Sequence, residues 1–172
     1  MQHNEQVILS PASAGARIKG FHNVGGWGTE GLRFIVENGV CPVEKWPANA
    51  IQRSYLTADN IALAKKYRIT EWYDLRPRNY KQLISCVLRN WPVAVGYNWW
   101  SHEVTAYDAV IVDGKVLLRI RNSWSMNWGD AGFSVLSVAK GTPDDAVVPR
   151  VALPTGNYGA LASILGSYQT AV

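Results

Sequence analysis

The second half of the chain contains residue types that could form a reaction centre sheltered by aromatic rings: His102, Asn122, Trp124 and Trp128. An imidazole close to a thiol lowers the pKa of the thiol, which attacks a carbonyl carbon as the thiolate. The ring must also be held in one orientation, and a side-chain amide oxygen that accepts from its other N–H does this. His102 and Asn122 could supply these two groups. Trp124, with Trp128 as a further candidate, would cover their hydrogen bond and exclude water.

Each of these residues also has a purely structural interpretation. A lone histidine on a strand is most often structural, an asparagine can bridge a turn, and tryptophans pack in cores. Gly25 and Gly26 raise the same question. A substrate backbone could approach the chain closely there, because a Cβ would clash with it. The two glycines could equally form only a turn.

The elements that would position these residues follow a simple order. Amphipathic spacing and end signals predict short helices first, at residues 12–19, around 32–36, and at 57–66, with a better one at 79–90. Strand-favouring runs precede and follow that helix, at residues 69–75, 93–97, 103–112, 116–121 and 132–138. Asp113-Gly114 between two of these runs predicts a tight hairpin. Helices followed by antiparallel strands indicate an α+β fold.

Composition narrows the classes of function. The formal charge is +4 and the basic residues are scattered, which argues against nucleic-acid binding. Neither end has a long apolar run or the pattern of a signal peptide, so we expect a soluble protein with no membrane partner. The two cysteines, Cys41 and Cys86, are predicted to be reduced thiols in the core. The three histidines have no paired ligand spacing, so we expect no metal site and no cofactor.

Three segments in a fixed order resemble the papain-like cysteine peptidases of the C1 family. The first carries Gly25-Gly26, Gly39 and Trp46-Pro47, where the family has a double glycine and a Glu-x-x-Tyr-Pro element. The second, from Trp91-Pro92 to the strand that begins at His102, is similar to the family's Gly-Pro-Val strand and its histidine strand. The third is the most specific: residues 121–133 are similar to the family's Asn-Ser-Trp-Gly, Trp-Gly and Gly-Tyr signature. The match covers roughly residues 9–138.

This resemblance implies an incomplete papain-like domain over residues 1–140. It would have short left-lobe helices at about 9–66, an antiparallel β-barrel-like right lobe at about 67–140, and an extended tail at 141–172. It also implies roles for the candidate residues. His102 and Asn122 would be catalytic, Trp124 and Trp128 would support them, and Gly25 and Gly26 would bind substrate.

The chain also departs from the family pattern. The family's nucleophilic cysteine, and the glutamine that helps to form its oxyanion hole, lie upstream of the point where this sequence starts. Cys41 and Cys86 are at positions that resemble ordinary core sites. Glu103 follows the histidine where the family usually has a small residue that lines a specificity pocket. Covalent catalysis and oxyanion stabilisation would then both be lacking.

These observations predict a papain-like homologue without its nucleophile, acting as a non-catalytic structural or protein-binding module. Segments 9–12 and 39–42 look like those of peptidases from bacteria and their viruses, which suggests a role in a viral particle. The alternatives are a peptidase whose cysteine and glutamine come from a separate polypeptide, and a truncated reading frame. The surface left by the missing helix should be covered by a protein partner, by a second copy, or by the apolar tail at 158–165.

Overall fold

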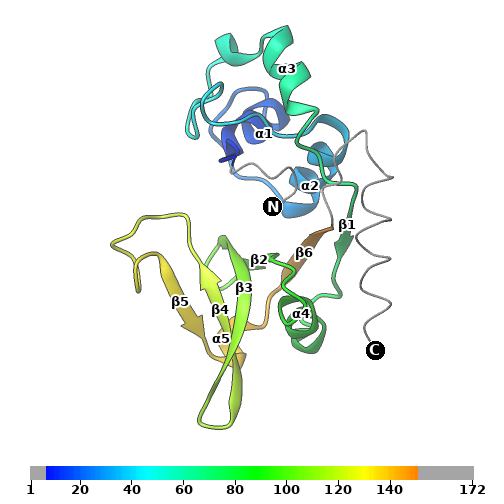
Figure 1. The fold of residues 1–172 in the computed structure, drawn as a ribbon. Coiled ribbons are helices and arrows are strands. Elements are labelled where there is room, and N and C mark those ends of the chain that lie inside the picture. The colour runs from blue at the N-terminus through cyan, green and yellow to red at the C-terminus, as the bar shows by residue number, and fades with distance from the viewer. Residues whose placement is uncertain (1–6, 151–172) are drawn as a thin grey trace, which may run out of the picture. The chain divides into compact units, whose positions relative to one another are not determined.

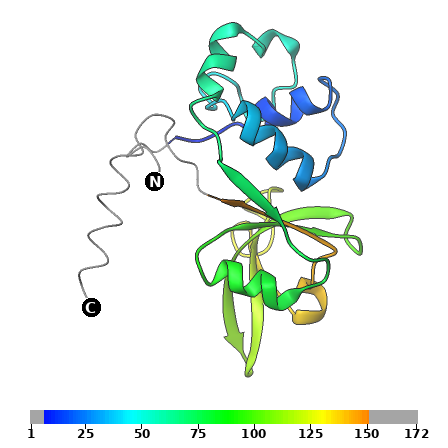
Figure 2. The ribbon, with the colours of Figure 1, turned by 90° about the vertical axis from the view of Figure 1, so that its right-hand side faces the viewer.

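A computed structural model describes residues 7–150, which separate into two compact units. The first, called here the helical unit, takes in residues 7–24 and 34–70. The second, the strand unit, takes in residues 25–33 and 71–150. Figures 1 and 2 show the helices of the first unit and the sheet of the second.

The helical unit is built from short helices: α1 (Pro11–Ile18), the second half of α2 (Gly28–Asn38), the 3-10 helix η1 (Arg53–Tyr55) and α3 (Ala58–Ala64). Pro11 begins α1, where its missing N–H leaves no helical bond unmade. The Thr57 hydroxyl accepts from the N–H of Asn60 and caps α3. Trp46 is buried at the centre of the unit, and its indole N–H donates to the carbonyl oxygen of Ala50 at 2.8 Å.

The strand unit contains one antiparallel sheet of six strands, in the order β1-β6-β2-β3-β4-β5. The strands are β1 (Glu71–Asp74), β2 (Val93–Tyr97), β3 (His102–Val112), β4 (Lys115–Arg121), β5 (Phe133–Leu136) and β6 (Asp145–Arg150). Two helices belong to this unit besides the start of α2: α4 (Tyr80–Val87) and α5 (Val138–Gly141).

The core of the strand unit lies between α4 and the central strands. Leu83, Cys86 and Val87 of α4 join a buried cluster with side chains from the strands, among them Val93, Val95, Ala106, Leu118, Ile120 and Val148. The predicted hairpin between β3 and β4 is confirmed: Asp113 and Gly114 both have positive φ, at 49° and 71°. His102 is the first residue of β3, where it pairs with Tyr97 of β2, and the β3–β4 ladder begins at Thr105.

The α+β class and the papain-like order of helices followed by antiparallel strands are confirmed, but the expectation of a barrel-like sheet is wrong. The sheet is open, with β1 and β5 at its two edges. Strands close into a barrel only when the first and last pair with each other, and here they do not.

A second correction concerns the predicted tail. Residues 145–150 form β6, which lies between β1 and β2 in the sheet, so the strand unit extends beyond residue 140. Two prolines, Pro143 and Pro149, hide this strand in the sequence. Pro149 is tolerated because it lies past the end of the β2 pairing and opposes only Trp72 of β1. The remainder of the predicted tail, including 158–165, lies outside the described residues.

No helix within residues 7–150 is long and apolar enough to cross a membrane.

Candidate active site

The antiparallel register of β3 and β4 brings the histidine and the asparagine together. Thr105 of β3 pairs with Arg121 of β4, so the residues that follow Arg121 run past the start of β3. His102 is the first residue of β3, and Asn122 comes directly after β4. The turn before β3 ends at Ser101, which has a positive φ of 50°. The two candidate side chains therefore meet, although they are 20 positions apart in the sequence.

His102 Nε2 lies 2.8 Å from Asn122 Oδ1. The backbone N–H of Ser123 also donates to this oxygen, at 2.8 Å, and a backbone amide can only donate. The Asn122 side-chain orientation is thereby fixed with its oxygen toward the ring, so Nε2 carries the proton of this hydrogen bond. In the neutral ring, Nδ1 is then the basic nitrogen. Asn122 is only 6% exposed, so the bond is sheltered from bulk water.

Tryptophan side chains surround this pair. The ring of Trp124 lies 4.7 Å from the imidazole of His102, measured between centroids, but this tryptophan is 55% exposed. Trp100 joins the cluster with its centroid 5.0 Å from His102, 5.5 Å from Trp124 and 5.8 Å from Trp128. The prediction that Trp124 packs against the His102–Asn122 pair is confirmed as geometry. Trp128 stacks on Trp100, so it lies further from the His102 ring than Trp100 does.

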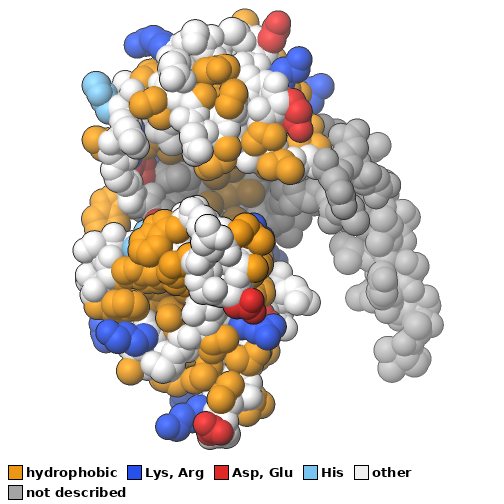
Figure 3. All heavy atoms as spheres, turned by 90° about the vertical axis from the view of Figure 1, so that its left-hand side faces the viewer, with side chains coloured by type: hydrophobic (Ala, Val, Ile, Leu, Met, Phe, Trp, Pro, Cys, Tyr) orange, Lys and Arg blue, Asp and Glu red, His pale blue; other side chains and the backbone are white. Residues whose placement is uncertain are grey.

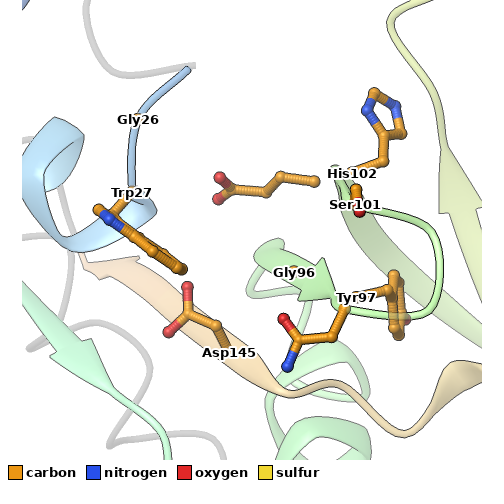
Figure 4. Close-up of a pocket in the computed structure, with 9 residues that line it drawn as sticks. Gly26, Trp27, Gly96, Tyr97, Ser101, His102 and Asp145 are labelled. Carbon is orange, nitrogen blue, oxygen red and sulfur yellow. The ribbon is translucent and has the colours of Figure 1, made fainter.

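A cavity of about 320 Å³ adjoins the histidine within the strand unit. Its lining residues are Gly26, Trp27, Gly96, Tyr97, Asn98, Ser101, His102, Glu103 and Asp145. Figure 4 shows His102 at the edge of this pocket, with its ring turned away from Asp145, and Trp27 on the side of Asp145. The predicted substrate-binding residue Gly26 therefore lines a cavity. Gly25 does not line it, and a Cβ added there would meet no atom within 4 Å.

Two carboxyl groups face this cavity in a partly desolvated environment. Burial raises the pKa of Glu103, the carboxylate of Asp145 raises it further, and His102 acts in the opposite direction. Burial also raises the pKa of Asp145, with a further contribution from Asp74 and an opposing hydrogen bond from the N–H of Ala146. Both groups thus resist ionisation more than exposed carboxyls do.

Neither cysteine belongs to this site. Cys86 lies in the core beneath the sheet, and Cys41 is 1% exposed in the core of the helical unit. Both are free thiols, as predicted. Burial is the main cause that raises the pKa of each thiol, the opposite of what a nucleophile needs.

No group of three or more His, Cys, Asp or Glu side chains in the described part of the chain could hold a metal ion. The chemistry available here is that of an oriented imidazole beside a cavity.

Sequence comparison finds cysteine peptidases. The chain is 28% identical to mexicain from Jacaratia mexicana over 137 residues, which are 68% of this chain and 61% of mexicain. It is 26% identical to cysteine proteinase 2 of Entamoeba histolytica, over 77% of this chain and 47% of that protein. It is 28% identical to chymopapain from Carica papaya, over 68% of this chain and 38% of that protein. No family model matches the chain.

Solved structures agree in fold. Procathepsin L 3 of Tenebrio molitor larval midgut superposes with a TM-score of 0.71 at 20% identity, covering 87% of this chain and 58% of that one. Bromelain from Ananas comosus, in complex with the E64 inhibitor, superposes with a TM-score of 0.69 at 22% identity, over 88% and 81% of the two chains. The chain is related to the papain-like cysteine peptidases.

This papain-like chain spans between 38% and 61% of the lengths of the sequence relatives named above. The similarity to the solved structures, at 20% and 22% identity, concerns the fold.

Several residues of the site were not anticipated from the sequence, and Trp27, Trp100 and Asp145 matter most for its chemistry. The Trp99-Trp100 pair directly before Ser101-His102 was a usable signal, because a large aromatic side chain so close in sequence to the candidate histidine can pack against its ring. Trp27 follows Gly25-Gly26 directly, and its type alone gives no sign that it lines a cavity. Asp145 gave no signal, since the strand that carries it was not predicted.

Proposed function

We propose that these 172 residues provide the histidine–asparagine half of a papain-like site, bind peptide chains beside it, and do not cleave them unaided. One observation carries this proposal. His102 is oriented by Asn122 at 2.8 Å, while both cysteines of the sequence are buried outside this site. The imidazole of His102 is therefore oriented to act as an acid or base, whereas neither cysteine of the sequence is placed to act as the nucleophile.

Peptide-bond cleavage by this chemistry needs a thiolate next to the imidazole. Cys41 and Cys86 have pKa values raised by burial, and neither lines the cavity beside His102. A buried neutral thiol is a poor nucleophile, since the thiolate is the attacking species. Hydrolysis by the chain alone therefore lacks its first step.

Peptide binding is supported by the surface around the pair. The cavity beside His102 has an open glycine backbone at Gly26 on one side. Trp27 and Trp124 keep 69% and 55% of their surface exposed. Figure 3 shows hydrophobic side chains gathered over one face of the strand unit. Exposed aromatic and apolar groups beside a concave site are typical of surfaces that bind protein chains.

A second candidate function is a complete cysteine peptidase whose thiol comes from a segment outside these 172 residues. The orientation of the imidazole favours it. Because Nε2 donates to Asn122, Nδ1 remains as a base that could activate a thiol. A ring with only a packing role would not need this arrangement.

Titration of the isotope-labelled chain with short capped peptides tests both ideas. We expect shifts of the amide signals of Gly26 and His102, and no cleavage products by mass spectrometry after prolonged incubation. Cleavage that disappears in a Cys41→Ser or Cys86→Ser variant would refute the proposal. Cleavage that appears only with an added cysteine-bearing polypeptide, and is lost in His102→Ala, would establish the second candidate.

A further inference from the structure

The pocket beside His102 has an unusual charge for this protein. Glu103 reaches it from β3 and Asp145 from β6, so two strands that are not neighbours each contribute a carboxyl group. Within the described part of the chain no lysine or arginine lines the pocket, although the whole sequence has a formal charge of +4. The pocket therefore has an excess of negative charge although the protein as a whole is basic, and a bound cation would neutralise this excess.

Neither carboxyl group forms an ion pair with any residue between 7 and 150. The nearby Asp144 contrasts with them, since it pairs with Arg78 at 2.6 Å. Partly buried carboxylates are normally paired or shift their pKa. Here the pKa values of Glu103 and Asp145 are raised, although His102, which also lines the pocket, acts against the rise at Glu103.

The Glu103 carboxyl group lies next to the start of α2. A Cβ added to Gly28, the first residue of α2, would lie 2.6 Å from Glu103 Oε1. The carboxyl group therefore rests directly against the backbone of this helix.

An aromatic face completes the pocket. Trp27 lies on the same side of the cavity as Asp145 (Figure 4), and it remains 69% exposed. Ammonium and guanidinium groups bind to carboxylates, and they also bind to the faces of tryptophan rings. Two carboxyl groups, one tryptophan face and a cavity of about 320 Å³ thus match one kind of ligand group.

We propose that this pocket binds the cationic side chain, arginine or lysine, of a peptide that lies beside His102. The inference rests on the proposed peptide-binding function and adds the class of side chain. The guanidinium or ammonium group enters between Glu103 and Asp145 and stacks on Trp27. A neutral or acidic side chain at this place of the peptide leaves the carboxyl groups unpaired, and an acidic one adds repulsion.

Calorimetric titration of the full chain with three capped tripeptides tests this. The peptides differ at one position, which is arginine, citrulline or glutamate. Citrulline has nearly the shape of arginine without its charge. We expect the arginine peptide to bind at least about tenfold more tightly than the citrulline peptide, a difference of about 1.4 kcal/mol. The glutamate peptide should bind most weakly, and salt should reduce the preference for arginine.

The double variant Glu103→Gln/Asp145→Asn should bind the arginine and citrulline peptides equally. The matched control is Asp113→Asn, which removes one carboxylate at the β3–β4 turn and should keep the preference. Cooperative unfolding of both variants verifies that they fold. Equal binding of arginine and citrulline peptides by the unaltered chain, or a preference that survives in the double variant, overturns the inference and leaves peptide binding intact. Failure of all three peptides to bind overturns peptide binding as well.

Discussion

Replacing Asn122 by alanine should destabilise the strand unit by about 1 to 2 kcal/mol. The change removes one oxygen that accepts two hydrogen bonds, from Ser123 N–H and from His102 Nε2–H, both at 2.8 Å. A buried donor that loses its partner costs about 1–3 kcal/mol, but Ser123 is exposed and the ring of His102 is half-buried, so both donors recover part of this from water. The buried Nδ2 of Asn122 has no hydrogen-bond partner among residues 7–150, so its removal returns about 1 kcal/mol.

Urea unfolding followed by tryptophan fluorescence measures this loss. Asn127→Ala is the matched control in the same loop. Asn127 is exposed, and its described hydrogen bond uses its backbone N–H, which alanine keeps. We expect this variant to differ from the unaltered chain by less than about 0.5 kcal/mol.

The tautomer of His102 gives a second readout that stability alone does not provide. Nitrogen-15 spectra of the neutral ring should show the proton on Nε2 in the unaltered chain. In Asn122→Ala we expect a mixture of the two tautomers, because nothing then fixes the ring proton. An unchanged tautomer together with an unchanged free energy of unfolding would refute the assignment of Asn122 as the residue that orients His102.

Three further predictions concern packing, pH and association. Gly28→Ala should lower the free energy of unfolding in urea by about 1–3 kcal/mol, since its Cβ would lie 2.6 Å from Val147 Cγ2. Gly31→Ala in the same helix would place its Cβ within 4 Å of no other atom and should raise the free energy of unfolding by up to about 1 kcal/mol. Equal effects of the two changes would contradict this. Because burial raises the pKa of Glu103, its charged form costs stability as pH rises above the usual value of 4.5. Glu103→Gln should therefore raise the free energy of unfolding at pH 7 but not near pH 4, and a pH-independent effect would count against a buried carboxyl. Light scattering at micromolar concentration should show self-association or aggregation of the isolated chain, because large apolar side chains such as Trp27 and Trp124 are exposed; a monodisperse monomer that binds no hydrophobic dye would contradict this.

The sequence predicted the parts of the fold that depend on local chemistry. The Asp113-Gly114 turn requires positive φ at both positions, and an Asp-Gly pair predicts such a turn. Helix α4 shows its apolar face in the spacing of Leu83 and Val87, although the structured helix is shorter than predicted. His102 and Asn122 were paired correctly through family resemblance. Their contact depends on the β3–β4 register, which no short pattern encodes.

What the sequence did not reveal depends on distant pairing. Strand β6 owes its place to partners on both sides, β1 and β2, and two prolines obscure its strand character. With β6 unrecognised, Asp145 could not be placed beside Glu103, and the acidic pocket stayed hidden. The open sheet edge was equally unpredictable, since alternation of residues fixes which face is buried and not whether the last strand meets the first.

Intact-mass analysis after incubation with an epoxide inhibitor directed at peptidase thiols tests the central claim most directly. The claim is that the chain carries the oriented His102 without a thiol that this histidine can activate. We predict that the mass stays at 19.0 kDa in the folded protein, while iodoacetamide in urea modifies both Cys41 and Cys86. A stoichiometric inhibitor adduct on either cysteine of the folded chain, abolished by His102→Ala, would contradict it.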